Sequence, residues 1–514
     1  MVKTININLL PEDAEDESLI RRAVKASDVM RKCRYWNYKV VRKSIDARSR
    51  QPKVMLTIEV YIDEQLPVEA PFDPQLQQVG NAKEVHIIGA GPAGLFAALK
   101  LISKGLKPVI LERGKDVRSR RRDLAAINRS GIVNPESNYC YGEGGAGTYS
   151  DGKLYTRSTK RGDVTRILKM LHYFGADERI LVEAHPHIGT NKLPDIITAI
   201  REQIVACGGE VHFNTKVTDI VLERDQIAGL KTADGKNFKC TNVILATGHS
   251  ADDIFELLDR KKIAIESKPY ALGVRIEHPQ SIIDTAQYHC DIRNEFLPPA
   301  SYSLVSQEQG HGVFSFCMCP GGIIAPAATS PGEIVVNGWS PSKRNNPFAN
   351  SGTVVTVDEH DFKKHGFTGQ LAGLRYRRMV EQISFKAGGG NLVAPAQRMV
   401  DFTQNKHSAT LPPCSYHPGL NSVLLNEVLP VEIYQPLQKA LVAFGGKMRG
   451  YFTNEAILVA TESRTSSPVR IPRDKDKLHH TQIKGLYPCA EGAGYAGGIV
   501  SAAIDGERCA EMIS

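Results

Sequence analysis

The segment KEVHIIGAGPAGLFAALKLISKGLKPVILERG, residues 83–114, decides how this chain folds. An apolar strand over residues 85–88 leads into a glycine-rich turn, an amphipathic helix and a second strand that ends at Leu111-Glu112. Two strands joined by so short a helical crossover predict a parallel sheet with a right-handed connection. The expected fold class is therefore α/β, built around a Rossmann-like domain.

The turn itself, Gly89-Ala90-Gly91-Pro92-Ala93-Gly94, has the spacing of a dinucleotide-binding loop. Gly89 permits a tight turn, Gly91 lets the backbone approach a pyrophosphate, and Gly94 lets the helix pack closely on the strand. The N-terminus of the helix offers free N–H groups and partial positive charge to the phosphates. The predicted cofactor contacts in this turn are Gly89, Gly91, Pro92, Ala93 and Gly94.

The end of the second strand, Glu112 followed by Arg113, strengthens this prediction. A carboxylate at this position can accept hydrogen bonds from both ribose hydroxyls of an adenosine, and it would repel a 2′-phosphate. Glu112 and Arg113 are therefore counted among the cofactor contacts. The alternative is a glycine-rich turn without a ligand, which the surrounding strand, helix and glutamate disfavour.

A second glycine-rich loop, YGEGGAGTYSDGK at residues 141–153, permits close backbone approach and positive φ angles. We expect this loop to follow the pyrophosphate and the ring edge of the cofactor, with Gly144, Gly145 and Gly147 as contacts. The alternative is a flexible surface loop.

The strand expected over residues 242–246 ends in Ala246-Thr247-Gly248. Gly248 allows a tight exit beside the cofactor, and Ser250 can cap the helix that follows, with Asp253 at its third position. Several short strands precede this one in the sequence. The contacts predicted in this region are Val217, Thr247 and Gly248.

The stretch GLYPCAEGAGYAGGIVSAAIDGERCAEMI, residues 485–513, has a strand that ends at Cys489 and a helix that opens at Gly497-Gly498. Glu491 stands where a carboxylate can bind a ribityl hydroxyl of FAD. The helix N-terminus could point at the flavin N1–C2=O edge, where negative charge develops on reduction. The contacts predicted here are Glu491, Gly492, Gly497 and Gly498. The alternative is a plain strand, turn and helix that close the sheet.

The 514 residues exceed what one hydrophobic core usually accommodates, and their pattern divides them into several segments. Strands expected over residues 4–9, 37–43 and 54–62, with a helix over 16–26, form a small α+β, ferredoxin-like unit. The predicted boundaries are 1–66 for this unit, 67–83 for a proline-bearing linker, 84–263 for the first part of the cofactor domain, 264–479 for an inserted mixed α+β substrate domain, and 480–514 for the return to the cofactor domain.

The composition argues against several classes of protein. The net charge of +8 suits an anionic cofactor or substrate. The sequence has no dense Lys/Arg tract interleaved with aromatic residues, so its charge pattern does not indicate nucleic-acid binding. No apolar run approaches the ~20 residues of a membrane-spanning helix, and the N-terminus lacks a signal-peptide core. Ten scattered cysteines without zinc-ligand spacing predict reduced thiols in the cytoplasm and no metal site.

Longer blocks carry a family resemblance. The chain resembles the uncharacterised bacterial FAD-dependent dehydrogenase family in SNYCYGEGGAGTYSDGKLYTR, AHPHIGTNKLP, FSFCMCPGGIIAPAAT, NGWSPSKRNNPFANSG, ESRTSSPVRIPRD and CAEGAGYAGGIVSAAIDGER. The GAGPAGL turn, the glutamate that ends the second strand, the ATG and the C-terminal acidic-Gly-x-Gly motif are similar to the glutathione-reductase-like FAD superfamily. The resemblance implies FAD and a flavin oxidoreductase fold, but no particular substrate. The chain departs from disulfide reductases, because Cys140 has no CxxxxC partner and a second GxGxxG for a nicotinamide is missing.

Three polar side chains that packing does not explain are the catalytic candidates, His185, His187 and Arg344. Either histidine could supply a proton to a substrate, and a packing or capping histidine is the alternative. Arg344 could bind a carboxylate or phosphate, as could Arg464, and a solvated basic loop is the alternative. Cys317 and Cys319 could exchange electrons with a flavin as thiols, although small buried residues are the simpler interpretation.

The expected function is that of an FAD-dependent oxidoreductase, which transfers a hydride between flavin N5 and a small organic substrate. The electron donor or acceptor would come from outside the chain. Two alternatives stay open. One is a flavin monooxygenase, and the other is an FAD-dependent nucleic-acid- or partner-binding protein that uses the N-terminal unit as its binding surface.

Overall fold

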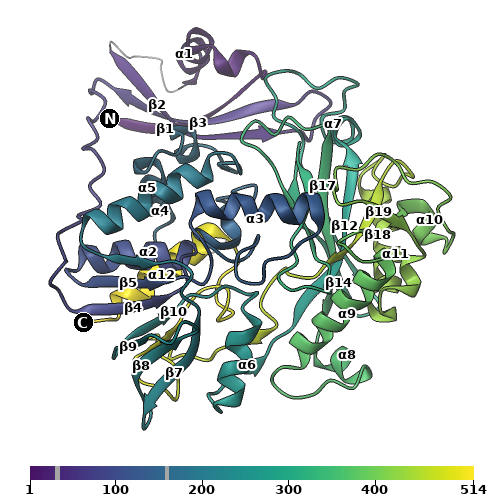
Figure 1. Ribbon diagram of the computed structural model, residues 1–514. Helices are drawn as coiled ribbons and strands as arrows, with labels where there is room; N and C mark the ends of the chain where they lie inside the picture. Colours follow the sequence, from purple (N-terminus) through teal and green to yellow (C-terminus); the bar gives the residue numbers. More distant parts are fainter. Residues whose placement is uncertain (29–34, 157–160) are drawn as a thin grey trace.

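Three sheet-bearing parts of the chain lie side by side in the computed structural model (Figure 1). The structure describes residues 1–28, 35–156 and 161–514, so Arg157 at the end of the first block quoted above lies outside them. A small N-terminal sheet lies above a parallel sheet covered by helices, and a large, mainly antiparallel sheet stands beside both. The mixed α/β class predicted from the sequence is confirmed.

The parallel sheet has the strand order β22-β10-β4-β5-β6, and each neighbouring pair is parallel. Its strands are β4 (Glu84–Ile88), β5 (Lys107–Leu111), β6 (Glu210–His212), β10 (Val243–Leu245) and β22 (Leu486–Pro488). Because β22 comes last in the chain and pairs with β10, the C-terminal segment completes this sheet.

The helix after β4, α2 (Pro92–Ser103), lies inside the core. Nine of its twelve residues are buried, so the expected amphipathic helix is instead apolar on nearly all sides. The C-terminal helix α12 (Ile499–Glu511) packs against it so closely that a Cβ at Gly506 would stand 2.1 Å from the Ala93 carbonyl oxygen. A Cβ at Gly94 would stand 2.0 Å from the Gly89 carbonyl oxygen, so only glycine fits between helix and strand.

The remaining elements of this half are α3 (Val117–Ser130), α4 (Val164–Tyr173), α5 (Leu193–Ala206), α6 (Asp252–Arg260) and an antiparallel sheet of β7 (Val217–Glu223), β8 (Gln226–Thr232) and β9 (Asn237–Lys239). The predicted cap of α6 is wrong. Its N-cap residue is Ala251, which has no side chain to bond the helix N–H groups. The Ser250 hydroxyl is engaged elsewhere, because it pairs with Nδ1 of His249 at 3.0 Å.

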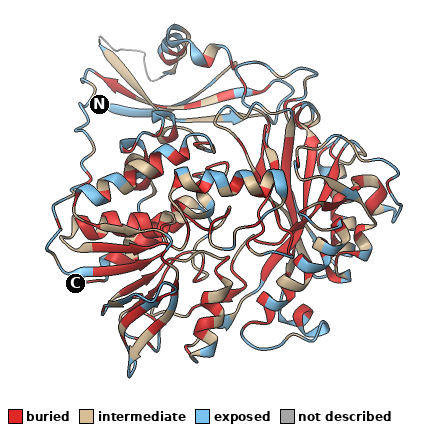
Figure 2. Ribbon diagram, viewed as in Figure 1, coloured by how far each residue is buried: buried red, intermediate tan, exposed pale blue. Residues whose placement is uncertain are grey.

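The large sheet has the order β13-β14-β17-β12-β20-β18-β19 and is antiparallel apart from the β18–β19 pair. Its strands are β12 (Tyr270–Pro279), β13 (Val305–Glu308), β14 (His311–Cys319), β17 (Phe348–Val357), β18 (Ala394–Arg398), β19 (Leu420–Ser422) and β20 (Ile457–Glu462). The central strands β12, β17 and β20 are buried along almost their whole length (Figure 2). This sheet is therefore the core of the second half of the molecule.

Shorter elements surround the large sheet. The helices are α7 (Gln280–Tyr288), α8 (Glu359–Lys364), α9 (Ala372–Gly388), α10 (Met399–Thr403) and α11 (Val431–Lys447), and the two-stranded pairs are β15 (Ile323–Pro326) with β16 (Val336–Trp339) and β11 (Glu266–Ser267) with β21 (Val469–Arg470). Within the described ranges, none of the helices combines the length and the apolar character needed to cross a bilayer.

The N-terminal unit is an antiparallel sheet of order β1-β3-β2 with one α-helix on it. It consists of β1 (Val2–Leu9), α1 (Glu17–Lys25), β2 (Trp36–Asp46) and β3 (Lys53–Ile62), close to the predicted ranges. A ferredoxin-like unit needs a second helix and a fourth strand. The described part of residues 1–66 has neither, because the chain passes from β3 into the proline-bearing linker, whose residues form no helix or strand. The main chain of this unit contacts the cofactor half at Lys43, whose backbone N–H donates to the Val182 carbonyl at 2.8 Å.

Candidate functional site

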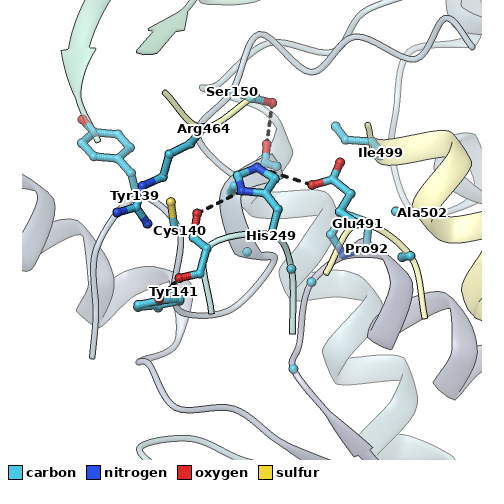
Figure 3. A pocket seen from close by; sticks show the side chains of 18 of the residues that line it. Pro92, Tyr139, Cys140, Tyr141, Ser150, His249, Arg464, Glu491, Ile499 and Ala502 are labelled. Atoms are coloured by element: carbon cyan, nitrogen blue, oxygen red, sulfur yellow. Dashed lines mark hydrogen bonds and ion pairs between the residues drawn. The ribbon is translucent and has the colours of Figure 1, made fainter. Parts of the chain in front are cut away.

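A cavity of about 410 Å³ opens where the two large sheets face each other. On one side it is lined by the loops that follow β4, β5, β10 and β22, which all leave the same edge of the parallel sheet. The opposite wall consists of residues 316–317, 325, 327, 337–339 and 464–465. Ligands of open α/β sheets bind at this carboxyl edge of the strands. Figure 3 shows side chains from both walls around the cavity.

Most of the predicted cofactor contacts line this cavity. They are Gly89, Gly91, Pro92, Ala93, Glu112, Arg113, Gly145, Gly147, Val217, Thr247, Gly248, Glu491, Gly497 and Gly498. Gly94, Gly144 and Gly492 are not on the wall. A Cβ at Gly144 would stand 2.1 Å from Thr148 Oγ1, and one at Gly492 would stand 2.5 Å from the Gly248 carbonyl oxygen. These glycines therefore allow the loops to pack behind the wall, and a direct cofactor contact is not supported for them.

Gly91 has the geometry of a pyrophosphate cradle. It is the N-cap residue of α2, and no heavy atom lies within 4 Å of the position that a Cβ would take. That free space faces the cavity, next to the N-terminal N–H groups of the helix. A phosphate group fits such a position because helix N-termini attract anions.

Glu112 departs from its expected role. Its buried carboxylate already accepts three backbone hydrogen bonds, from Ala90 at 2.8 Å and from Gly114 and Gly142 at 2.9 Å each. A carboxylate offers about four acceptor positions, so about one is left for a ligand. The prediction that Glu112 takes both ribose hydroxyls is therefore not supported. Instead, this side chain ties three loops of the cavity wall together.

The start of α12 also differs from expectation. Gly498, with φ +112°, is the N-cap residue, and its N–H donates to Oε1 of Glu491 at 2.5 Å. Glu491 lines the cavity, but it serves first as an acceptor for this helix terminus. The N-terminus of α12 lies at the cavity, with a carboxylate beside it, and its contact with the flavin N1–C2=O edge stays a prediction.

His249 is a cavity residue that the sequence reasoning missed. Its Nδ1 pairs with the Ser250 hydroxyl, and its Nε2 lies 3.7 Å from Oε2 of Glu491 (Figure 3). Burial lowers the pKa of His249, so the ring is held neutral, although Glu491 opposes that shift. His249 directly follows Ala246-Thr247-Gly248, at the carboxyl end of a parallel strand. Residues at such strand ends face the ligand crevice, so this position could have predicted His249 as a site residue.

Arg464 lies on the opposite wall and is buried. It donates to both carboxylate oxygens of Glu381, at 3.1 Å and 3.0 Å, and more weakly to Glu333 at 3.5 Å. Among the described residues, its Nη1 has no hydrogen-bond partner. Because this nitrogen is itself buried, Arg464 acts on the cavity through its positive charge and not through a free N–H group.

The three catalytic candidates do not lie on the cavity wall. His185 is exposed against the Tyr155 ring, and His187 pairs with the Ser342 carbonyl at 3.1 Å. Arg344 forms two hydrogen bonds with Asp151, at 3.1 Å and 2.6 Å, and so fixes a wall residue from behind. Sequence spacing could not show this, because which carboxylate pairs with Arg344 depends on a contact across the two halves of the molecule.

Four family models match the chain. Residues 82–234 match the model of an FAD binding domain, and residues 193–313 match FAD dependent oxidoreductase. Residues 269–465 match FAD-dependent protein, C-terminal domain-like, and residues 1–61 match a domain of unknown function, DUF8436. The FAD models cover the turn at Gly89–Gly94 and the wall that contains Arg464, and FAD is therefore the cofactor of this protein.

Three solved structures are similar to this chain at low sequence identity. Glycine oxidase from Bacillus cereus is 13% identical, with 84% of this chain and 94% of that chain covered and a TM-score of 0.30. L-proline dehydrogenase from P. horikoshii is 13% identical, with 85% and 94% covered and a TM-score of 0.34. Halogenase PltM is 13% identical, with 83% and 67% covered and a TM-score of 0.35.

A relative in sequence covers the whole chain. An uncharacterized protein of Clostridium beijerinckii is 37% identical over 531 residues, which span 100% of this chain and 98% of the relative. The glutathione-reductase-type assignment stays a prediction, since the matching models are those of FAD-dependent oxidoreductases and FAD binding domains more generally. The chain belongs to an uncharacterised family of FAD-dependent oxidoreductases.

Proposed function

We propose that this protein transfers a hydride between flavin N5 and a small organic substrate that carries an anionic group. The observation that carries the proposal is one cavity lined both by the glycine turn at the start of α2 and by the buried cation Arg464. The cavity is also lined by the aromatic side chains of Tyr139, Phe316 and Trp339. The apolar part of the substrate would therefore pack against aromatic rings.

The residues of the two walls have separate tasks in this proposal. Gly91 and the N-terminus of α2 hold the pyrophosphate, and bound FAD supplies the two-electron hydride chemistry. The positive charge of Arg464 on the cavity wall attracts the anionic group of the substrate. The aromatic side chains exclude water, and the neutral ring of His249 can hold a proton at Nε2, since Nδ1 is engaged by Ser250.

The proposal is tested by anaerobic bleaching of the bound flavin. A panel of 2-hydroxy, 2-amino and dicarboxylic acids is mixed with the purified protein, and each acid is paired with its neutral amide. We expect an acid to bleach the flavin at least tenfold faster than its amide, since only the acid carries a negative charge that Arg464 attracts. If an amide reduces the flavin as fast as its acid, the proposal that the substrate carries an anionic group is contradicted.

We expect no tight nicotinamide site in the chain, because it has a single dinucleotide-binding turn, at Gly89–Gly94. NADPH and NADH are titrated anaerobically and flavin absorbance is followed. Reduction should be slow and should not saturate, and the electron donor or acceptor would then be a separate molecule. Rapid, saturable reduction at micromolar NADPH would show that the expectation is wrong.

Two substitutions at the start of α12 should move the flavin midpoint potential in opposite directions. Gly498→Leu forces a side chain into a backbone conformation with φ +112°, so the helix start must shift. We hypothesise that this terminus stabilises negative charge on the reduced flavin, and its loss should lower the potential by roughly 10–40 mV. Glu491→Gln keeps an acceptor for the Gly498 N–H but removes a negative charge, so the potential should rise. Anaerobic redox titration measures both, and an unchanged potential in each variant would leave α12 with only a packing role.

A further inference from the structure

Two cysteines of β14 meet the cavity at its second wall. Cys317 lies on the wall, and Cys319 is fully buried two residues further along. The backbone is irregular here, because Cys317 has φ +47° and the pairing of β14 with β17 shifts register between Phe316 and Cys319. A non-glycine residue adopts the left-handed region at a cost, and such strain concentrates at functional sites.

Both sulfurs lie near one half-buried cation, Lys153, whose Nζ also donates to the Met318 carbonyl. Lys153 Nζ lies 3.9 Å from Cys317 Sγ and 4.0 Å from Cys319 Sγ. A second cation approaches from β12, where Arg275 Nη2 donates to Cys319 Sγ at 3.4 Å and to the Cys317 carbonyl at 2.7 Å. Cysteines that only fill space do not need cations at their sulfur atoms, and the fully buried Arg275 is costly unless its charge is compensated.

The charges of this described cluster do not balance with neutral thiols. Asp151, 3.9 Å from Lys153, is bound at 2.6 Å by Arg344, so two cations share one carboxylate. Arg275 has its own carboxylate, Glu462, at 3.0 Å. Glu183 also acts on Arg344 electrostatically, but Lys153 has only the shared carboxylate of Asp151, so its positive charge is matched only in part. A thiolate at Cys317 would neutralise it, since a thiolate forms readily next to lysine or arginine.

The acid strengths of the two thiols agree with this geometry. The pKa of Cys317 lies well below its usual range, because Cys319 hydrogen-bonds to it and Lys153 and Arg275 attract the anion, against the effect of burial. The pKa of Cys319 lies well above its usual range, because it shares that hydrogen bond and is buried. The other ionisable groups that face the pair are Asp151, Glu462 and Tyr302.

We propose that Cys317 and Cys319 are a dithiol–disulfide couple, which gives this FAD protein a second two-electron redox centre beside the flavin. In the oxidation, the Cys317 thiolate and the Cys319 thiol form one S–S bond, and the Cys319 S–H bond breaks. One proton and two electrons leave the pair. The acceptor is oxidised FAD, which takes up two electrons and one proton, so the step is balanced. The inference rests on the proposed function only in assigning FAD to this cavity.

The number of reducing equivalents tests the proposal on the FAD-loaded protein. The protein is oxidised with diamide, freed of the reagent and titrated anaerobically with dithionite. Wild type should consume two two-electron equivalents per bound FAD, whereas Cys317→Ser and Cys319→Ser should each consume one. Cys140→Ser is the matched control, since Cys140 also lines the cavity but is not part of this pair, and it should still consume two.

A second measurement does not depend on flavin. After removal of FAD and treatment with diamide, the wild-type peptide that contains both cysteines should be lighter by two hydrogens and should resist iodoacetamide. In the reduced apoprotein, Lys153→Met should slow the alkylation of Cys317 by about tenfold near neutral pH, because each unit of thiol pKa changes the thiolate fraction tenfold.

A wild type that consumes a single equivalent, with the peptide mass unchanged and both thiols alkylated after diamide, overturns the couple. This result is distinct from a failure of the proposed function, since a protein that ignores every acid of the substrate panel can still form the disulfide. If the serine variants fold poorly and lose FAD, the wild-type peptide mass decides alone, and an unchanged mass counts against the proposal.

Discussion

Gly91→Val should abolish tight FAD binding and leave the fold intact. Gly91 has an extended backbone, φ −75° and ψ −177°, which valine adopts without strain, and nothing lies within 4 Å of its added Cβ. The valine side chain would therefore point into the cavity, in the place we assign to the pyrophosphate. We expect FAD to bind at least about a hundredfold more weakly, which corresponds to about 2.8 kcal/mol.

Gly80→Val is the matched control for this variant. Gly80 also has open space around its added Cβ, but it lies in the linker and not on the cavity wall. FAD released from each purified protein is quantified, and its dissociation constant is measured by flavin fluorescence. FMN in place of FAD, or normal FAD affinity in Gly91→Val, would remove the assignment of the adenosine half to this turn.

Arg464→Leu should destabilise the protein strongly, by about 3–5 kcal/mol, because it leaves a buried carboxylate without its main partner. Glu381 is fully buried, and Arg464 gives it two hydrogen bonds. Its remaining partners are the Ser463 hydroxyl at 2.6 Å and Arg377 at 3.5 Å. Burial and the neighbouring Glu381 already raise the pKa of Glu333 to about 7, so this cluster tolerates no further loss of positive charge.

The measurement is urea unfolding at saturating FAD, so that cofactor binding stabilises each variant equally. Removing both partners, in Arg464→Leu with Glu381→Leu, should recover much of the lost stability, because no buried charge is then left alone. Lys343→Leu, an exposed residue of the neighbouring basic loop, should change the free energy of unfolding by less than about 0.5 kcal/mol. Equal effects of Lys343→Leu and Arg464→Leu would argue that Arg464 is only a solvated side chain.

The cofactor half of the site could be predicted because its signal is local. The turn from Gly89 to Gly94 lies between one strand and one helix, and each glycine answers to backbone geometry within that unit. The same holds for Gly497-Gly498 at the start of α12. The sequence predicted less well those roles that depend on which groups a side chain bonds to in the folded protein. Glu112 lines the cavity, but the three backbone N–H groups that bind its carboxylate come from separate loops, which the sequence did not show.

By itself, the sequence determined the α/β class, the FAD turn and the strand that carries each cofactor loop, since these follow from periodicity and glycine positions over short stretches. Only the tertiary structure decided which polar residues face the second wall of the cavity. Arg344 and Arg464 look alike in the sequence, yet the first lies off the cavity wall, where it binds Asp151, while the second lies on that wall. Lys153 and Cys317 likewise meet only when the two sheets pack together. The reason is physical, because the burial of a charge and the atoms that compensate it are set by contacts between segments far apart in the chain.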